Sequence, residues 1–235
     1  MLRLSGGREA RLSPLGVPRQ RWRGRPSIAP VKRLAARARE RLAELVTGRD
    51  LVLAHGAPPD RYGRIRAQIF RTETDGSHTW IQAELVRAGL ARVESEADTR
   101  QCAAELLRLE AQARARRRGL WRLRLFSVRR AEEAGRHTGS WQIVEGRIRS
   151  IAQVRGRTYV NFGDDWRTDF TISVSPRAGR RFPENFWENK EGRRVRVRGR
   201  LERYNGPLIE ATHPEQLEWP ERSEEREARR TAVSE

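Results

Sequence analysis

Short runs of alternating hydrophobic and polar residues dominate the first part of the chain. Leu2 to Leu15 reads as two short strands joined by a turn at Gly6-Gly7, which is a local hairpin signal. From Val31 to Val46 the apolar residues recur on one helical face, and Gly48 follows at a position typical of a helix end. Leu51 to Ala54 predicts a further strand.

The next part of the chain combines a turn, a hairpin and two helices. In the stretch Asp60 to Arg87, the DRYGR turn leads into the alternating run IRAQIF and a hairpin turn at Asp75-Gly76. AELVRAGLARV, from Ala83 to Val93, opens a helix. A second helix is predicted from about Asp98 to Arg117, and Gly119-Leu120-Trp121 closes it.

The second half of the chain has a strand pattern of its own. Leu123 to Thr138 is charged and poorly patterned, which favours a linker. Five strands and a helical piece between the third and the fourth then follow, in the segments WQIVEGRIRSIAQV, TYVNF, FTISV, FPENFWENK (the helical piece), RRVRVRGRLERY and PLIEATH. From Pro220 glutamate and arginine alternate, so we expect a disordered tail.

Composition adds two constraints to this pattern. The 235 residues are 37% hydrophobic, which is low but sufficient for two small cores. The formal net charge of +18 comes almost entirely from arginine and favours an anionic partner, with nucleic acid as the first candidate. An arginine-rich overall composition is the alternative cause of part of this excess.

Several other classes of protein are disfavoured. The single cysteine, Cys102, excludes an internal disulfide and a cysteine-rich zinc site. No apolar run approaches the ~18 residues of a membrane span, and the residues after Met1 lack the apolar core of a secretion signal. We therefore expect no membrane partner and, by default, a cytoplasmic protein. The sequence does not determine the oligomeric state.

Three of these segments together resemble the staphylococcal nuclease (thermonuclease) family. They are DRYGR before a core strand, ELVRAGLA at the start of a helix, and the closing helix AAELLRLEAQARARRRGLW. The resemblance covers Leu2 to about Trp121. It implies a five-stranded oligonucleotide/oligosaccharide-binding (OB) barrel with packed helices. The segments GRIRSI, TYVNFG and VRVRGRLERYNGPLIEATHPEQLE resemble small OB-type nucleic-acid-binding domains, which implies a second barrel.

The expected fold is thus mixed α+β and mainly β, with two small five-stranded barrels. The predicted boundaries are residues 1–122 for the nuclease-like domain, 123–138 for the linker, 139–219 for the OB-like domain and 220–235 for the tail.

The resemblance also implies site residues. In the family, carboxylates hold a calcium ion, a glutamate assists the attacking water, and two arginines bind the phosphate. Arg11 and Arg64 fall on the phosphate-binding arginines, while Arg61 and Tyr62 fall where the family contacts the phosphate and the sugar. Each could instead be an ordinary exposed surface residue in a chain this rich in arginine.

The family's carboxylates have no counterparts at the matching positions. Gly16 falls on a metal aspartate and Arg19 on the catalytic glutamate, and the remaining aspartate would precede Met1. Arg19 would place a cation where the calcium sits. We therefore predict no metal ligands and no bound cofactor. Glu9, Asp60 and Asp75 are possible substitutes, although Asp60 is better explained as a turn residue.

Aromatic residues in the second half offer a different kind of contact. Small barrels bind single strands by stacking bases on exposed rings within a basic groove. Tyr159 and Tyr204, which lie next to arginines, are the predicted nucleic-acid contacts, and about half of the aromatic residues should be core.

Three functions remain open at this point. The first is a nucleic-acid-binding protein of the nuclease family that has lost its hydrolytic centre, with single-stranded nucleic acid as the partner. The second is an active calcium-dependent phosphodiesterase that uses substitute carboxylates or has a longer N-terminus. The third is a protein-interaction scaffold. The absent carboxylates favour the first over the second, and the arginine excess favours it over the third.

Overall fold

A computed structural model describes residues 2–4, 7–18, 21, 22, 25, 26, 28–54 and 57–220, with the backbone alone described at 21, 22, 25 and 26. Three predictions lie outside these residues: the Gly6 half of the first turn, the side chain of Arg19 and the tail beyond Pro220. The chain divides into two compact units, Met1–Ser127 and Val128–Glu235, and each is described by itself.

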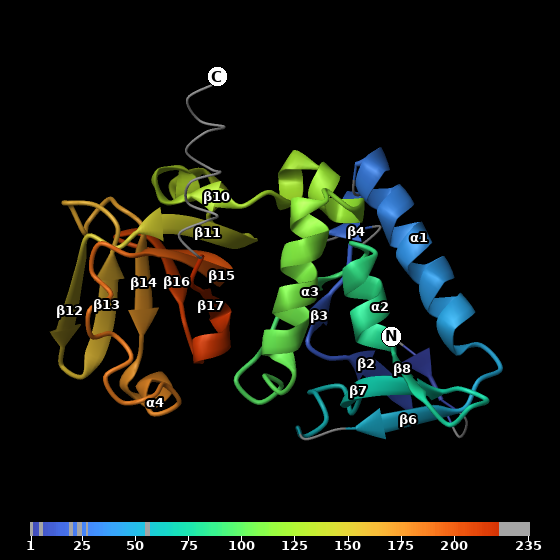
Figure 1. Ribbon diagram of the computed structural model, residues 1–235. Helices are drawn as coiled ribbons and strands as arrows, with labels where there is room; N and C mark the ends of the chain where they lie inside the picture. The colour runs from blue at the N-terminus through green and yellow to red at the C-terminus, as the bar shows by residue number, and fades with distance from the viewer. Residues whose placement is uncertain are drawn as a thin grey trace. The chain divides into compact units, whose positions relative to one another are not determined.

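The first unit is built on a curled five-stranded sheet (Figure 1). Its order is β1 (Leu2–Arg3), β2 (Glu9–Leu12), β7 (Ile65–Thr72) and β6 (Leu51–Ala54), and β8 (His78–Trp80) also pairs with β7. The predicted hairpin between β1 and β2 is confirmed, because Leu2 pairs antiparallel with Ala10. β2 and β7 run parallel, which aligns Arg11 with Arg66.

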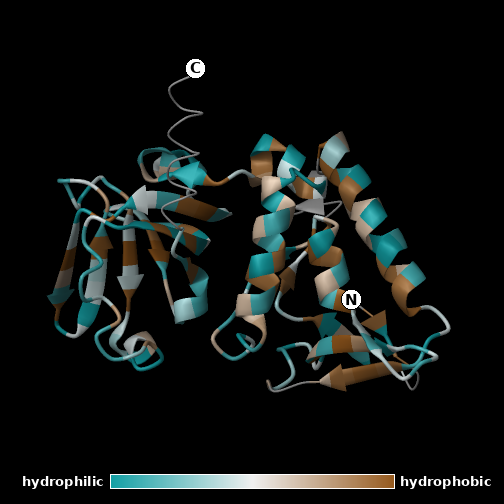
Figure 2. Ribbon diagram, in the orientation of Figure 1, coloured by the Kyte–Doolittle hydropathy of each residue, from teal (hydrophilic) through white to brown (hydrophobic). Residues whose placement is uncertain are grey.

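Three helices accompany this sheet: α1 (Ala29–Val46), α2 (Ile81–Arg87) and α3 (Ala103–Ala115). Apolar and polar residues alternate around α1 and α3 (Figure 2), and α1 buries Val31, Leu34, Ala35, Ala38 and Leu45. The prediction of α1 is confirmed within two residues. α3 is shorter than predicted because the chain turns at Cys102, which has a left-handed φ of 61°.

Short elements complete the first unit. β3 (Leu15–Gly16) pairs with β9 (Arg92–Val93), and β4 (Arg21–Trp22) pairs with β5 (Arg25–Pro26). The 3₁₀ helix η1 (Gly119–Arg122) follows α3, and its Leu120 and Trp121 are buried, as the predicted closure requires. A second 3₁₀ helix, η2, spans Arg124–Phe126.

The second unit contains an eight-stranded mixed sheet. Its path runs in the order β10 (Arg129–Arg130), β11 (Trp141–Arg147), β15 (Arg194–Tyr204), β16 (Gly206–Glu210), β14 (Thr171–Val174), β13 (Arg157–Asn161) and β12 (Ser150–Val154), with β17 (Leu217–Glu218) paired to β15. The short helix α4 (Pro176–Gly179) follows β14, whereas the predicted helical piece FPENFWENK, residues 182–190, forms turns instead of a helix.

The α+β class is confirmed, but the closed five-stranded barrels are not. In the described part of the first unit no ladder joins β1 to β6 or β8, because β1 and β8 have only two and three residues. In the second unit, β11 and β12 are not neighbours, because β15, β16, β14 and β13 lie between them in an open sheet. The chain between them bends, because the N–H of Ile148 bonds the Arg193 carbonyl while that of Arg149 bonds the Asn161 carbonyl.

The segment interpreted as a linker, residues 123–138, has regular structure. It includes η2, β10 and the 3₁₀ helix η3 (Ala131–His137), and β10 pairs parallel with β11. Ala131 and Ala134 are buried in the core of the second unit. Charged residues dominate the sequence pattern of this segment, so the pattern did not predict the burial of these two alanines.

Candidate nucleic-acid pocket and surrounding residues

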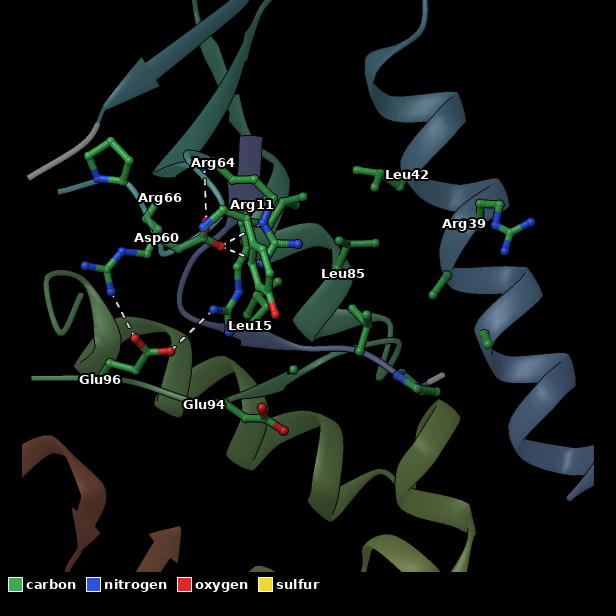
Figure 3. A pocket seen from close by; sticks show the side chains of 18 of the residues that line it. Arg11, Leu15, Arg39, Leu42, Asp60, Arg64, Arg66, Leu85, Glu94 and Glu96 are labelled. Atoms are coloured by element: carbon green, nitrogen blue, oxygen red, sulfur yellow. Dashed lines mark hydrogen bonds and ion pairs between the residues drawn. The ribbon is translucent and has the colours of Figure 1, made fainter. Parts of the chain in front are cut away.

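A cavity of about 1260 Å³ lies in the first unit beside the DRYGR turn (Figure 3). Its walls come from β2 and β3, from the turn before β7, from one face of α1, and from the chain after β9. It brings together the predicted site residues of this unit that the structure describes, which are Arg11, Gly16, Arg61, Tyr62 and Arg64.

The DRYGR turn is held by Asp60. Its Oδ1 accepts hydrogen bonds from the backbone N–H groups of Tyr62 (2.9 Å) and Arg64 (3.1 Å), and Gly63 supplies a φ of 75°. Its Oδ2 accepts a bond from the Arg64 Nε at 2.7 Å. The Arg64 hydrogen bond lowers the pKa of Asp60 to about 2, and the same pairing raises the pKa of Arg64. Asp60 therefore orients Arg64 at the cavity wall.

Tyr62 lies at the rim, and two guanidinium groups contact its ring. Its side chain is 65% exposed, and the guanidinium carbons of Arg61 and Arg64 lie 4.8 and 4.9 Å from its ring centre. The two cations stack on the ring and hold it in an exposed position, where a further planar group could pack against it.

A second ion-pair network lies at the cavity, and the sequence analysis missed it. Glu96 lies between two arginines, 3.5 Å from Arg11 and 2.9 Å from Arg66 (Figure 3). Arg66 is almost buried, and it also donates to the carbonyl of Pro58 (2.9 Å) and to Asp98 (3.0 Å). These carboxylates raise the pKa of Arg66. The alignment of Arg66 with Arg11 depends on a parallel pairing that sequence spacing does not encode.

Gly16 is the position where the family resemblance implies a metal-binding carboxylate. A Cβ built on Gly16 would lie 2.0 Å from the carboxyl carbon of Glu94, so Glu94 fills the space of the absent side chain. β3 and β9 place the two residues together, and the N–H of Glu94 bonds the Pro14 carbonyl at 2.7 Å. Glu94 in turn accepts a bond from the Arg92 Nε at 2.7 Å.

The carboxylates at the cavity do not form a calcium site. Asp60, Glu94 and Glu96 all line it, but each is ion-paired with arginine. Over the described ranges, no three His, Cys, Asp or Glu side chains gather as ligands for one ion. Calcium requires about six to eight oxygen ligands. The described residues therefore do not fit the ion that the resemblance implies.

The other proposed substitutes lie elsewhere. Glu9 and Asp75 are not among the residues that line the cavity. Asp75 caps the β7–β8 hairpin turn, where its Oδ1 accepts bonds from the N–H (2.9 Å) and the hydroxyl (2.6 Å) of Ser77, which lower its pKa. Its role is that of a turn residue.

In the second unit the two predicted contacts differ in exposure. Tyr204, at the end of β15, is 68% exposed, whereas Tyr159 on β13 is largely buried. Trp166 is also 50% exposed, and the Arg167 guanidinium stacks on it at 4.4 Å. Trp187 lines a separate cavity of about 540 Å³ with Phe182 and Phe186. The structure brings neither Tyr159 nor Tyr204 into that cavity as far as it is described.

Comparison with known families identifies part of the chain. Residues 9–123 match the model of a family described as "Staphylococcal nuclease homologue", and the match does not extend into the second unit. A search of curated proteins gave no match. None of the helices in the described ranges is long and apolar enough to cross a membrane.

Proposed function

We propose that this chain, which carries a staphylococcal nuclease family domain at residues 9–123, binds nucleic acid and does not hydrolyse it efficiently. The observation that carries the proposal is the pair Gly16 and Glu94. The space for a carboxylate at position 16 is filled by a glutamate that is itself bound to Arg92.

The chemistry of hydrolysis explains why this matters. Cleavage of a phosphodiester needs an activated water and stabilisation of the negative charge that develops in the transition state. Arg11 and Arg64 supply positive charge at the cavity, and Tyr62 supplies a ring at its rim. These groups bind a phosphate and a sugar or base, but they do not activate water. Binding therefore survives while turnover is lost.

The exposed aromatic residues of the second unit support a single-stranded partner. Tyr204 and Trp166 are at least half exposed, and a base can stack on either ring. Such stacking tolerates any sequence because every base has a π-face. Tyr159 is the third proposed contact, with a smaller exposed face.

A calcium-dependent phosphodiesterase remains the second candidate because one observation favours it. The cavity does hold carboxylates, since Asp60, Glu94 and Glu96 all line it. If the ion pairs with arginine opened, these groups could serve as ligands or as a general base. Their present pairing disfavours this function.

Three measurements on the purified chain separate these functions. We expect binding of a labelled single strand that weakens by orders of magnitude from low to moderate salt, and no calcium-stimulated cleavage of DNA or RNA. Calcium should not raise the melting temperature, since an ion that does not bind the native state does not stabilise it. Chelator-sensitive cleavage that Arg64→Ala abolishes would establish the enzyme instead, and absence of binding at low salt would favour the scaffold.

A further inference from the structure

The positive charge of this chain is concentrated in the first unit, outside the cavity. Residues 1–127 contain 27 Lys and Arg against 13 Asp and Glu, which is most of the net charge of +18. One run of this unit, residues 111–127, contains six arginines and no carboxylate. This run begins within α3 and ends with η2, and no residue of it lines the cavity.

Four arginines of this run have no carboxylate partner among the residues that the structure describes. Arg116, Arg117, Arg118 and Arg122, together called the α3 basic end, are exposed. No carboxylate of the described residues pairs with any of them, and Arg118 donates a 3.2 Å hydrogen bond to the uncharged carbonyl of Arg87. At the cavity, by contrast, three of the five arginines that line it, Arg11, Arg64 and Arg66, are each paired with a carboxylate.

The backbone of the α3 basic end is an independent indication that the arginines have a role. The N–H of Arg118 bonds the Ala113 carbonyl and that of Arg117 bonds the Arg114 carbonyl, both at 2.9 Å, which is a Schellman ending of α3. Arg117 occupies the left-handed position of this motif, with a φ of 48°. Glycine is the usual residue there, because a side chain with a Cβ is strained at such a φ. A charged residue held at an unfavourable position suggests function.

The segment is also fixed in place. Gly119 packs backbone to backbone on Gly89, and the Leu120 N–H bonds the Gly89 carbonyl at 2.8 Å. Leu120 and Trp121 are buried between the exposed arginines. A phosphate that binds these guanidinium groups therefore orders little additional backbone, which favours affinity.

We infer that the α3 basic end is a binding surface for the phosphate backbone of nucleic acid, separate from the cavity. The inference rests on the proposed nucleic-acid-binding function and assigns much of its affinity to these arginines. Guanidinium groups pair with phosphate through two parallel hydrogen bonds and are more weakly hydrated than ammonium groups. When arginines without a carboxylate partner bind phosphates, the counterions of those phosphates are released, and this release favours binding. An arginine that is paired with a carboxylate must first break that ion pair, which reduces its contribution to the affinity.

The test compares two triple variants that lower the charge equally. Arg116→Gln, Arg117→Gly and Arg122→Gln remove charge from the α3 basic end. The control, Arg3→Gln, Arg49→Gln and Arg108→Gln, removes exposed arginines of the same unit that lie neither there nor at the cavity. Binding is measured by fluorescence anisotropy with a labelled oligothymidylate over a salt series.

We expect the first triple variant to weaken binding at least tenfold at low salt. Its slope of log affinity against log salt should decrease by about 2, for three single-strand phosphate contacts at ~0.7 each. The control should change affinity less than threefold. Equal losses in both variants would overturn the inference, because affinity would then follow net charge alone. Absence of binding by the unmodified chain would instead reject the proposed function.

Two further measurements exclude misfolding and a lipid partner. Arg117→Gly alone should weaken binding while the melting temperature stays constant or rises, since glycine relieves the left-handed strain. Unchanged affinity in this variant would count against the inference. The second measurement is the binding of the chain to vesicles that contain phosphatidylserine. If the triple variant loses vesicle binding but keeps oligonucleotide binding, the surface serves anionic lipid and the inference is wrong.

Discussion

The side chain of Glu94 occupies the space that a side chain at position 16 would fill, and this is possible because residue 16 is glycine. Gly16→Asp would place a Cβ at 2.0 Å from the Glu94 carboxyl carbon, and two carboxylates would share the space. We expect this variant to lower the free energy of unfolding by about 1 to 3 kcal/mol, as overpacked sites do. Thermal melting measures the loss.

A second substitution supplies the control for this clash. Glu94→Ala should restore the stability of Gly16→Asp, while Glu94→Ala alone should change it less because it removes only the pair with Arg92. Additive losses in the double variant would show that the two side chains do not compete. Even the double variant Gly16→Asp with Glu94→Ala should cleave DNA at most weakly, since Asp60 and Glu96 remain paired with arginines.

Asp60 makes the DRYGR turn sensitive to acid. Its pKa in the folded state is about 2, below the ordinary value of 3.8, so its stabilising effect is complete above about pH 4. The effect is lost as the pH falls from 4 to 2. Asp60→Asn should therefore be less stable than the unmodified chain at pH 6, and this difference should shrink towards pH 2.5. Urea midpoints at three pH values measure it, with Glu40→Gln on α1 as the control. A difference that is constant with pH would contradict the assignment.

At the scale of elements, the end of α2 and the start of η1 meet at two glycines. A Cβ on Gly89 would lie 2.3 Å from the Arg118 carbonyl oxygen, and one on Gly119 would lie 2.2 Å from that of Gly89. Both residues also have positive φ. Alanine at either position should cost about 3 kcal/mol or more, from left-handed strain and overpacking together.

A substitution at Gly76 measures the left-handed strain without the overpacking. It has a φ of 80° in the β7–β8 turn but no atom within 4 Å of a built Cβ. Gly76→Ala should therefore cost only the strain, about 1 to 2 kcal/mol. Similar denaturation midpoints for Gly76→Ala and Gly119→Ala would mean that the backbone of η1 moves aside freely. The α3 basic end would then lack the rigid support inferred for it.

At the scale of the whole molecule, the boundary of the second unit can be tested by truncation. The fragment 128–220 keeps β10 and η3, whereas the fragment 139–219 loses both. Removal of Ala131 and Ala134 exposes part of the core that also contains Val144 and Ile148. We expect 128–220 to unfold cooperatively and 139–219 to melt at a lower temperature. Equal melting temperatures would show that 128–138 is the linker that its composition suggests.

The sequence by itself determined the features that depend on neighbours along the chain. Periodicity located α1 and β6, the aspartate and glycine of the DRYGR turn predicted its tight backbone, and the Gly-Leu-Trp ending of α3 indicated a buried anchor. These features follow from local hydrogen bonds and from apolar residues on one face. The same local motifs located the nuclease family domain.

Tertiary structure alone decided which side chains meet in the cavity. Glu94 reaches Gly16 because β9 pairs with β3, and Glu96 reaches Arg11 and Arg66 because β2 and β7 run in parallel. Residues far apart in the chain form these contacts, and hydrophobic periodicity carries no information on strand partners. For the same reason the sequence suggested closed barrels and a linker. In the second unit the bend at Ile148 and Arg149 decided that β11 and β12 are separated in the sheet, and the packing of Ala131 and Ala134 decided that this part of the charged segment lies in the core of that unit.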